Sequence, residues 1–169
     1  MKNRIIIIIA LAFFNVITAQ TVVDMEFTKD KVVILNGKTL GPNTSFDEVK
    51  EILGTPVVYK SYPTDKTNYH YEELGISFHT VDDKLLFIGL NFNWDGDKTF
   101  PETSYSGTFK IDDLSIDKDS DHSIVDKIEM VKLVTIMPNF YMSNPKVEST
   151  PIILGFKNNV VTQIGFEFH

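Results

Sequence analysis

Four histidines and a short run of alternating aspartates are the residues of this chain best suited to chemistry. The histidines are His70, His79, His122 and His169. No two of them have the i, i+4 spacing that lets one helix face hold a metal, and the sequence contains no HExxH, GxSxG or glycine-rich phosphate motif. Cysteine is absent, which removes disulfides, thiolate nucleophiles and cysteine-bound metals. We therefore expect a protein that is not an enzyme and that uses no cofactor.

The aspartates Asp117, Asp119 and Asp121 alternate like the first ligands of a calcium-binding loop. However, His122 stands where such a loop needs glycine, and Ile128 stands where it needs a bidentate glutamate. The pattern favours a solvated acidic turn before a helix. A calcium site remains open as the alternative.

The N-terminus has the layout of a secretory signal peptide. Lys2 and Arg4 precede an apolar run from Ile5 to Phe14, and cleavage after Ala19 or Gln20 fits the small residues there. The run is short for crossing a bilayer, so an uncleaved anchor is the less economical alternative. We predict a signal peptide over residues 1–20, export to the periplasm or the outside medium, and no stable membrane anchor.

The formal net charge is −7, and removal of the basic signal peptide makes the mature chain more acidic by two charges. An acidic surface repels nucleic acid and anionic lipid. We therefore expect a protein partner and no nucleic-acid partner.

The stretch SFDEVKEILGTP, residues 45–56, predicts a short helix. Ser45 and Glu48 have the spacing of a capping box, and Val49 and Ile52 lie on one apolar stripe. Gly54 can close the helix in a left-handed conformation. A helix this short must pack its stripe against another element to be stable.

Strand-like segments surround this helix. A hairpin turn is predicted at Asn36-Gly37, because this dipeptide tolerates the positive φ of a tight turn. Four alternating runs come after the helix, at residues 57–62, 67–72, 75–81 and 84–94. Their short connections imply an antiparallel meander.

The pattern repeats at an offset of 76 residues. Val49 aligns with Val125 and Ile76 with Ile152 under this offset, and the match continues through the last strand. Chance similarity between amphipathic strands is the alternative. We predict an α+β fold of two tandem units, each with a short hairpin, one short helix and an antiparallel meander of about four strands. The sheets join with the helices on one face. The predicted first unit covers residues 21–92, the linker residues 93–107 and the second unit residues 108–169.

A capped helix ending in Leu53-Gly54-x-Pro56, followed by Tyr69-x-Tyr71 and a Gly75-Ile-x-Phe78 strand, resembles the helix-plus-meander unit of the SmpA/OmlA outer-membrane assembly lipoproteins. In tandem it is similar to the β-lactamase inhibitor protein family and to secreted, immunity-like bacterial proteins. The resemblance implies two sheets joined side by side with one open face. The chain lacks the lipid-bearing cysteine of the lipoproteins and the disulfides of the inhibitors, so neither specific function carries over.

Strand alternation indicates which residues lie on that open face. The expected partner-binding positions are Ser77, His79, Leu85, Phe87, Asn91, Asn93, Gln163, Glu167 and His169. Mixed aromatic and polar groups favour recognition, although antiparallel sheets also leave one face in water without any partner. We expect an exported, non-catalytic module that recognises or inhibits a protein of unknown identity. The alternative is a structural or assembly component of the bacterial cell envelope.

Overall fold

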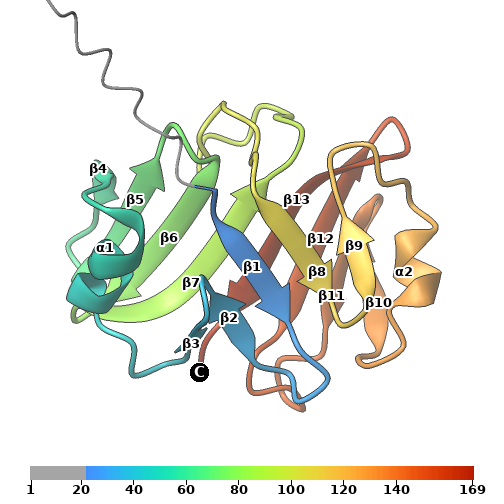
Figure 1. Cartoon of the computed structure of the whole chain (residues 1–169), viewed down its shortest axis with the longest axis horizontal. Coiled ribbons are helices and arrows are strands. Elements are labelled where there is room, and N and C mark those ends of the chain that lie inside the picture. The colour runs from blue at the N-terminus through green and yellow to red at the C-terminus, as the bar shows by residue number, and fades with distance from the viewer. Residues whose placement is uncertain (1–21) are drawn as a thin grey trace, which may run out of the picture.

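A computed structural model describes residues 22–169, and the predicted signal peptide lies outside this range. The chain folds into two β-sheets and two short helices, which makes it an α+β protein dominated by strands (Figure 1). Among residues 22–169, no helix has the length and hydropathy to cross a membrane.

The smaller sheet has five strands in the order β3-β2-β1-β8-β9. These strands are β1 (Asp24–Phe27), β2 (Val33–Leu35), β3 (Lys38–Leu40), β8 (Thr108–Ile111) and β9 (Leu114–Ile116). β1 lies in the middle, antiparallel to β2 and parallel to β8. The predicted Asn36-Gly37 turn is confirmed, because both residues have positive φ, 47° and 78°.

The larger sheet has eight strands in the order β10-β11-β12-β13-β7-β6-β5-β4. The first meander consists of β4 (Val57–Ser61), β5 (Lys66–Tyr71), β6 (Ile76–Val81) and β7 (Lys84–Asn91). The second consists of β10 (Leu133–Met137), β11 (Phe140–Ser143), β12 (Ile152–Lys157) and β13 (Val160–Glu167). The four runs predicted after the helix are therefore strands. The two meanders join through antiparallel pairing of β7 with β13.

Helix α1 (Phe46–Leu53) has the predicted capping box. The Glu48 amide donates to Ser45 Oγ at 3.2 Å, and the Ser45 amide donates to the Glu48 carboxylate at 2.8 Å. These hydrogen bonds lower the pKa of Glu48 because they favour its charged form. Gly54 ends the helix with φ 86°.

Helix α2 (Ile124–Lys127) is one turn long, which is shorter than the apolar stripe in the sequence suggests. Ser123 precedes the helix without a side-chain cap, and Asp121 Oδ1 accepts the Ser123 amide at 2.8 Å. Ile124, Ile128 and Val131 are nonetheless buried in the core. The stripe therefore identifies the buried side chains although most of it is not helical.

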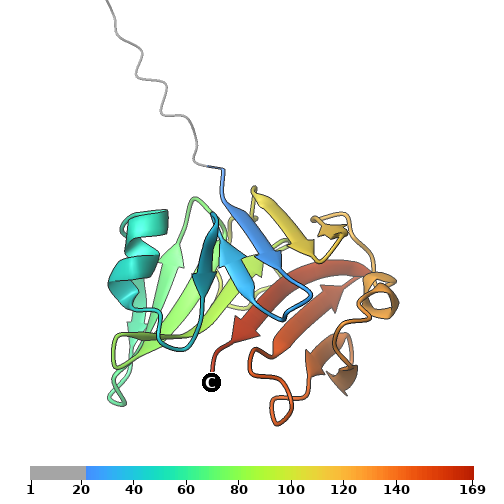
Figure 2. The same cartoon turned by 60° about the horizontal axis from the view of Figure 1, so that its bottom comes forward.

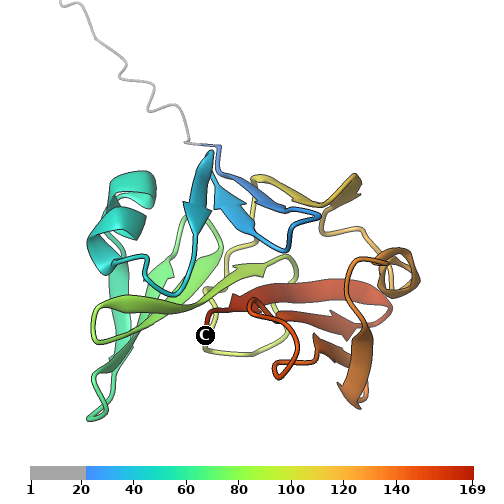
Figure 3. The same ribbon diagram turned by 90° about the horizontal axis from the view of Figure 1, so that it is seen from below.

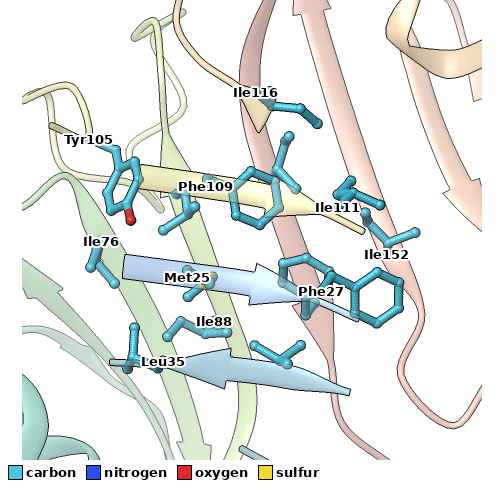
Figure 4. Packing of buried hydrophobic residues seen from close by; sticks show 14 of the residues in the cluster. Met25, Phe27, Leu35, Ile76, Ile88, Tyr105, Phe109, Ile111, Ile116 and Ile152 are labelled. Carbon is cyan, nitrogen blue, oxygen red and sulfur yellow. The ribbon is translucent and has the colours of Figure 1, made fainter. Parts of the chain in front are cut away.

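The hydrophobic core lies between the two sheets. Met25, Phe27 and Leu35 of the smaller sheet face Ile88 and Ile152 of the larger one (Figure 4). Both helices and the smaller sheet lie on the same side of the larger sheet (Figures 2 and 3). Burial of these apolar side chains supplies the main stabilisation, as cysteine is absent. The opposite side of the larger sheet, here called the outer face, is where the sequence predicts the binding site.

Candidate functional site

The outer face has two halves that belong to the two meanders. The first half is formed by the outward residues of β4 to β7, and the second half by those of β10 to β13. Residues 93–107, predicted as a linker, form a loop that crosses the first half before the chain returns to β8. We call this segment the covering loop.

Asn91 of β7 anchors the covering loop. Its Nδ2 donates to the carbonyl oxygens of Pro101 at 2.9 Å and of Thr103 at 3.0 Å. The side chain is only 2% exposed. The prediction that Asn91 lies open to a partner is therefore wrong, because the chain's own backbone occupies its hydrogen-bonding group.

Ser77 and His70 hold the middle of the covering loop. Ser77 Oγ donates to the Thr99 carbonyl at 2.7 Å, and His70 Nε2 lies 2.9 Å from the same oxygen. Both side chains are buried. Ser77 was also expected to be open, and this expectation is wrong for the same reason as for Asn91. A backbone carbonyl can accept two hydrogen bonds, so one loop oxygen satisfies both side chains.

His79 lies half-buried on this half, with its ring 4.8 Å from that of Phe87. The Phe87 ring in turn meets Phe100 of the covering loop edge-on at 6.1 Å. His79 Nε2 is buried and has no hydrogen-bond partner among the described residues. Burial lowers the pKa of His79 to about 4, and the charges of Lys66 and His70 act in the same direction, against Asp97. The imidazole is therefore neutral at neutral pH.

Two glycines at the centre of the outer face were expected to admit a partner's backbone. The space above them is instead filled by the protein's own rings. A Cβ at Gly165 would come within 2.4 Å of the Phe87 ring, and one at Gly89 within 2.6 Å of Phe100. The glycines therefore make room for Phe87 and Phe100, which lie across the junction of β7 and β13.

Leu85 is not on the outer face, contrary to the prediction. It is 2% exposed and belongs to the core. The pairing of β6 with β7 shifts between His79 and Thr80, so that Thr80 lies opposite Leu85 while His79 lies opposite Phe87. This bulge adds one residue to β7 and reverses the alternation on which the prediction depended.

The remaining predicted positions are partly exposed or buried at the junction. Asn93 Nδ2 donates to the carbonyls of Lys118 and Val161, each at 2.7 Å, which fixes the start of the covering loop. Gln163 is buried beside Gly155. Glu167 and His169 approach to 3.4 Å and retain partial exposure. These positions therefore form no continuous polar surface.

The second half of the outer face is apolar, and no described residue crosses it as the covering loop crosses the first half. Phe140, Met142 and Ile153 are half-buried outward residues that lie outside the core cluster. On β10, Ile136 is 49% exposed and Met137 is 57% exposed. The sequence analysis missed these residues. Their signal was the absence of any charged residue between Lys132 and Lys146.

The aspartate run forms an acidic turn held by its own backbone. Asp117 Oδ1 accepts the Asp119 amide at 3.0 Å, and Asp121 accepts the Ser123 amide. Hydrogen bonding within the turn lowers the pKa of Asp121. Within residues 22–169, no three His, Asp or Glu side chains gather closely enough to hold a metal ion.

The fold and the outer face together define a two-sheet α+β domain with an apolar, uncovered half on one sheet. The chain belongs to the family described as Domain of unknown function (DUF7738), which it matches over residues 25–126, more than half of its length. Searches of the curated proteins and of the solved structures gave no significant match.

Proposed function

We propose that this chain is an exported, non-catalytic module that binds a protein through the second half of its outer face. The observation that carries the proposal is the unequal covering of the two halves. Contiguous exposed apolar residues, as on β10 and β11, mark interaction sites on soluble proteins. The predicted site therefore moves from the centre of the face to Val134, Met137, Phe140, Met142 and Ile153.

We further infer that the domain consists of two tandem units related by the 76-residue offset. Support comes from the strand bounds: β4 and β10, β6 and β12, and β7 and β13 each begin and end 76 residues apart. The hairpin β2–β3 has the same relation to the last three residues of β8 and to β9. Chance alignment of alternating sequences does not require such agreement in three-dimensional pairing.

The strand registers add independent support, because they are symmetric about one line. Gly89 pairs with Gly165, the residue 76 positions later, in the β7–β13 junction. In the smaller sheet, Glu26 of β1 lies between Ile34 and Lys110, which are also 76 positions apart. A pseudo-twofold axis through Glu26 and the Gly89–Gly165 pair accounts for both registers. The covering loop breaks this symmetry, so we look for function in what differs between the halves.

Export is the part of the proposal that rests on the sequence of residues 1–20. The basic start and the apolar run there are typical of signal peptides. N-terminal sequencing of protein recovered from the periplasm and from the medium tests this part. Recovery of intact Met1 in the cytoplasmic fraction alone would contradict it.

The binding site is tested by quantitative affinity capture from envelope and secreted fractions of the producing cells. The wild type is compared with Met142→Asp/Ile153→Asp, which places two charges on the second half. We expect the variant to lose the proteins that the wild type captures. The matched control is Val57→Asp, an exposed apolar position on β4 at the far end of the same face.

The control should capture the same proteins as the wild type. Equal capture by the wild type and the double variant, with both proteins folded by circular dichroism, would overturn the assignment of the site. Loss of capture by the Val57→Asp variant alone would move the site to the first half.

A further inference from the structure

The larger sheet has two free edges, and they differ in a way that bears on self-association. The edge strands are β4, with sequence VVYKS, and β10, with sequence LVTIM. An edge strand carries unpaired backbone amides and carbonyls that can pair with another strand. Proteins commonly block such pairing with a charged residue, especially lysine, on the edge.

β4 has this protection and β10 does not. Lys60 lies within β4, and its ammonium group lies 4.7 Å above the Tyr62 ring, which Lys66 also approaches. The position 76 residues after Lys60 is Ile136, which is 49% exposed on β10. Both strands carry a bulge against their inner neighbour, at Tyr59 and at Ile136, so the bulge does not distinguish the two edges.

Charge favours a second copy of this chain as the occupant of the β10 edge. The protein is acidic, with a formal net charge of −7, so two copies repel across most of their surfaces. The hairpin of β10 and β11 carries no charge, and the nearest charged residues in sequence are the basic Lys132 and Lys146. It therefore offers acidic chains a contact without opposed carboxylates.

We infer that β10 pairs antiparallel with β10 of a second copy, which makes a twofold dimer with one continuous sheet of sixteen strands from two sheets of eight. Antiparallel pairing of a strand with its own copy satisfies the symmetry of an isologous dimer, the commonest oligomer. The junction of β7 with β13 already shows the same kind of pairing within one chain.

Pairing centred on Thr135 brings residues of the same kind together. Thr135 then lies opposite its own copy, and Val134 lies opposite Ile136 of the other chain. Threonine pairs and β-branched pairs are favourable across antiparallel strands. The twofold axis is perpendicular to the sheet, so the apolar second halves of both copies lie on the same side and become continuous. The dimer does not depend on the proposed protein partner, but it would present that partner with a doubled surface.

The test is sedimentation velocity of the purified, cell-processed protein over a roughly hundredfold concentration range, because the dimer fraction follows mass action. Wild-type protein should change from monomer to dimer as concentration rises. Ile136→Lys gives β10 the lysine that β4 has, and it should raise the dimer dissociation constant by at least about tenfold, because it brings like charges together near the twofold axis.

Two further variants keep the test decisive. Ile136→Val retains an apolar, β-branched edge and should dimerise like the wild type. Val57→Lys adds a charge to the other edge and should also dimerise like the wild type. All variants should show the circular dichroism of the folded protein.

Three results would overturn the inference. The first is a wild-type monomer at every concentration. The second is equal weakening by Ile136→Lys and Val57→Lys. The third is assembly beyond the dimer that grows with concentration, because this would indicate open-ended pairing of β4 with β10 in place of a closed twofold contact.

Discussion

The two halves of the outer face are built on similar four-stranded meanders, yet they solve the problem of facing water differently. On the first half, outward polar side chains such as Ser77 and Asn91 donate to backbone carbonyls of the covering loop. On the second half, the outward side chains are apolar, as at Met142 and Ile153, and no described residue crosses them. A buried polar group is stable only with a partner, so the first half and its loop depend on each other. An uncovered apolar half gains stability only when another molecule covers it.

The strongest challenge to the first half is Gly75→Ala. Gly75 has φ 68°, and an added Cβ would lie 2.4 Å from the backbone nitrogen of Tyr105, where the covering loop returns. We expect a loss of about 3 kcal/mol or more in the free energy of unfolding, from strain and overpacking together. Denaturant titration measures it.

Gly96→Ala is the matched control, since Gly96 has φ 105° but no atom within 4 Å of the added Cβ. Backbone strain alone should cost it about 1 kcal/mol. Equal losses in the two variants would contradict the close packing of the loop on β6.

Acid should weaken the first half through His79. Its pKa is about 4 when folded and about 6.5 when unfolded, so the unfolded state binds the proton first as pH falls. Stability is therefore complete above pH 6.5 and decreases as pH drops towards 4, by roughly 3 kcal/mol from this group.

The stability of His79→Phe is compared with that of the wild type between pH 7.5 and pH 4. The variant lacks the titrating group, so the difference between the two free energies of unfolding should change steadily over this range. A difference that is constant with pH would show that His79 is not buried in its neutral form.

Asn91→Ala removes the side chain that holds the loop carbonyls of Pro101 and Thr103. We expect a loss of about 2 kcal/mol, because buried acceptors are left without donors. Glu167→Ala is the control, at the position 76 residues later on the second half, and should change stability by less than about 0.5 kcal/mol. Equal losses would remove the distinction between the halves.

The smallest effect on stability is expected on the second half. Met142→Asp/Ile153→Asp changes side chains that lie outside the core cluster, so we expect a loss below about 1 kcal/mol. Thermal unfolding measures this loss. A loss as large as that of Gly75→Ala would mean that the second half is part of the folding core.

The sequence predicts the local elements well because their signals are local. The capping box at Ser45, the Asn36-Gly37 turn and the strands of the first meander are all predicted by short patterns, and the structure confirms them. The apolar stripe at Ile124 and Ile128 correctly predicts burial, although the helix there has only one turn. A stripe reports a buried face, whereas helix length also depends on the cap and on the residues at the C-terminal end.

The covering loop could not be predicted, because its contacts use backbone carbonyls that every residue possesses. Residues 93–107 have the turn-forming composition of any linker. The position of Leu85 depended on a bulge in β7, which leaves no signature in hydrophobic alternation. The space at Gly89 and Gly165 similarly says nothing about whether a partner or the protein's own Phe87 fills it. The apolar second half was visible as a charge-free stretch, and only the fold shows that it lies at an edge.

The central claim, that one half of the outer face is covered and the other is not, is most directly tested by hydroxyl-radical footprinting of the free protein at low concentration. Phe100 and Phe140 are the informative pair, because they share one intrinsic reactivity while Phe100 is only 7% exposed beneath the loop's own packing. We predict clearly stronger labelling of Phe140 and of Met142 than of Phe87 and Phe100. Equal labelling of Phe100 and Phe140 would contradict the account.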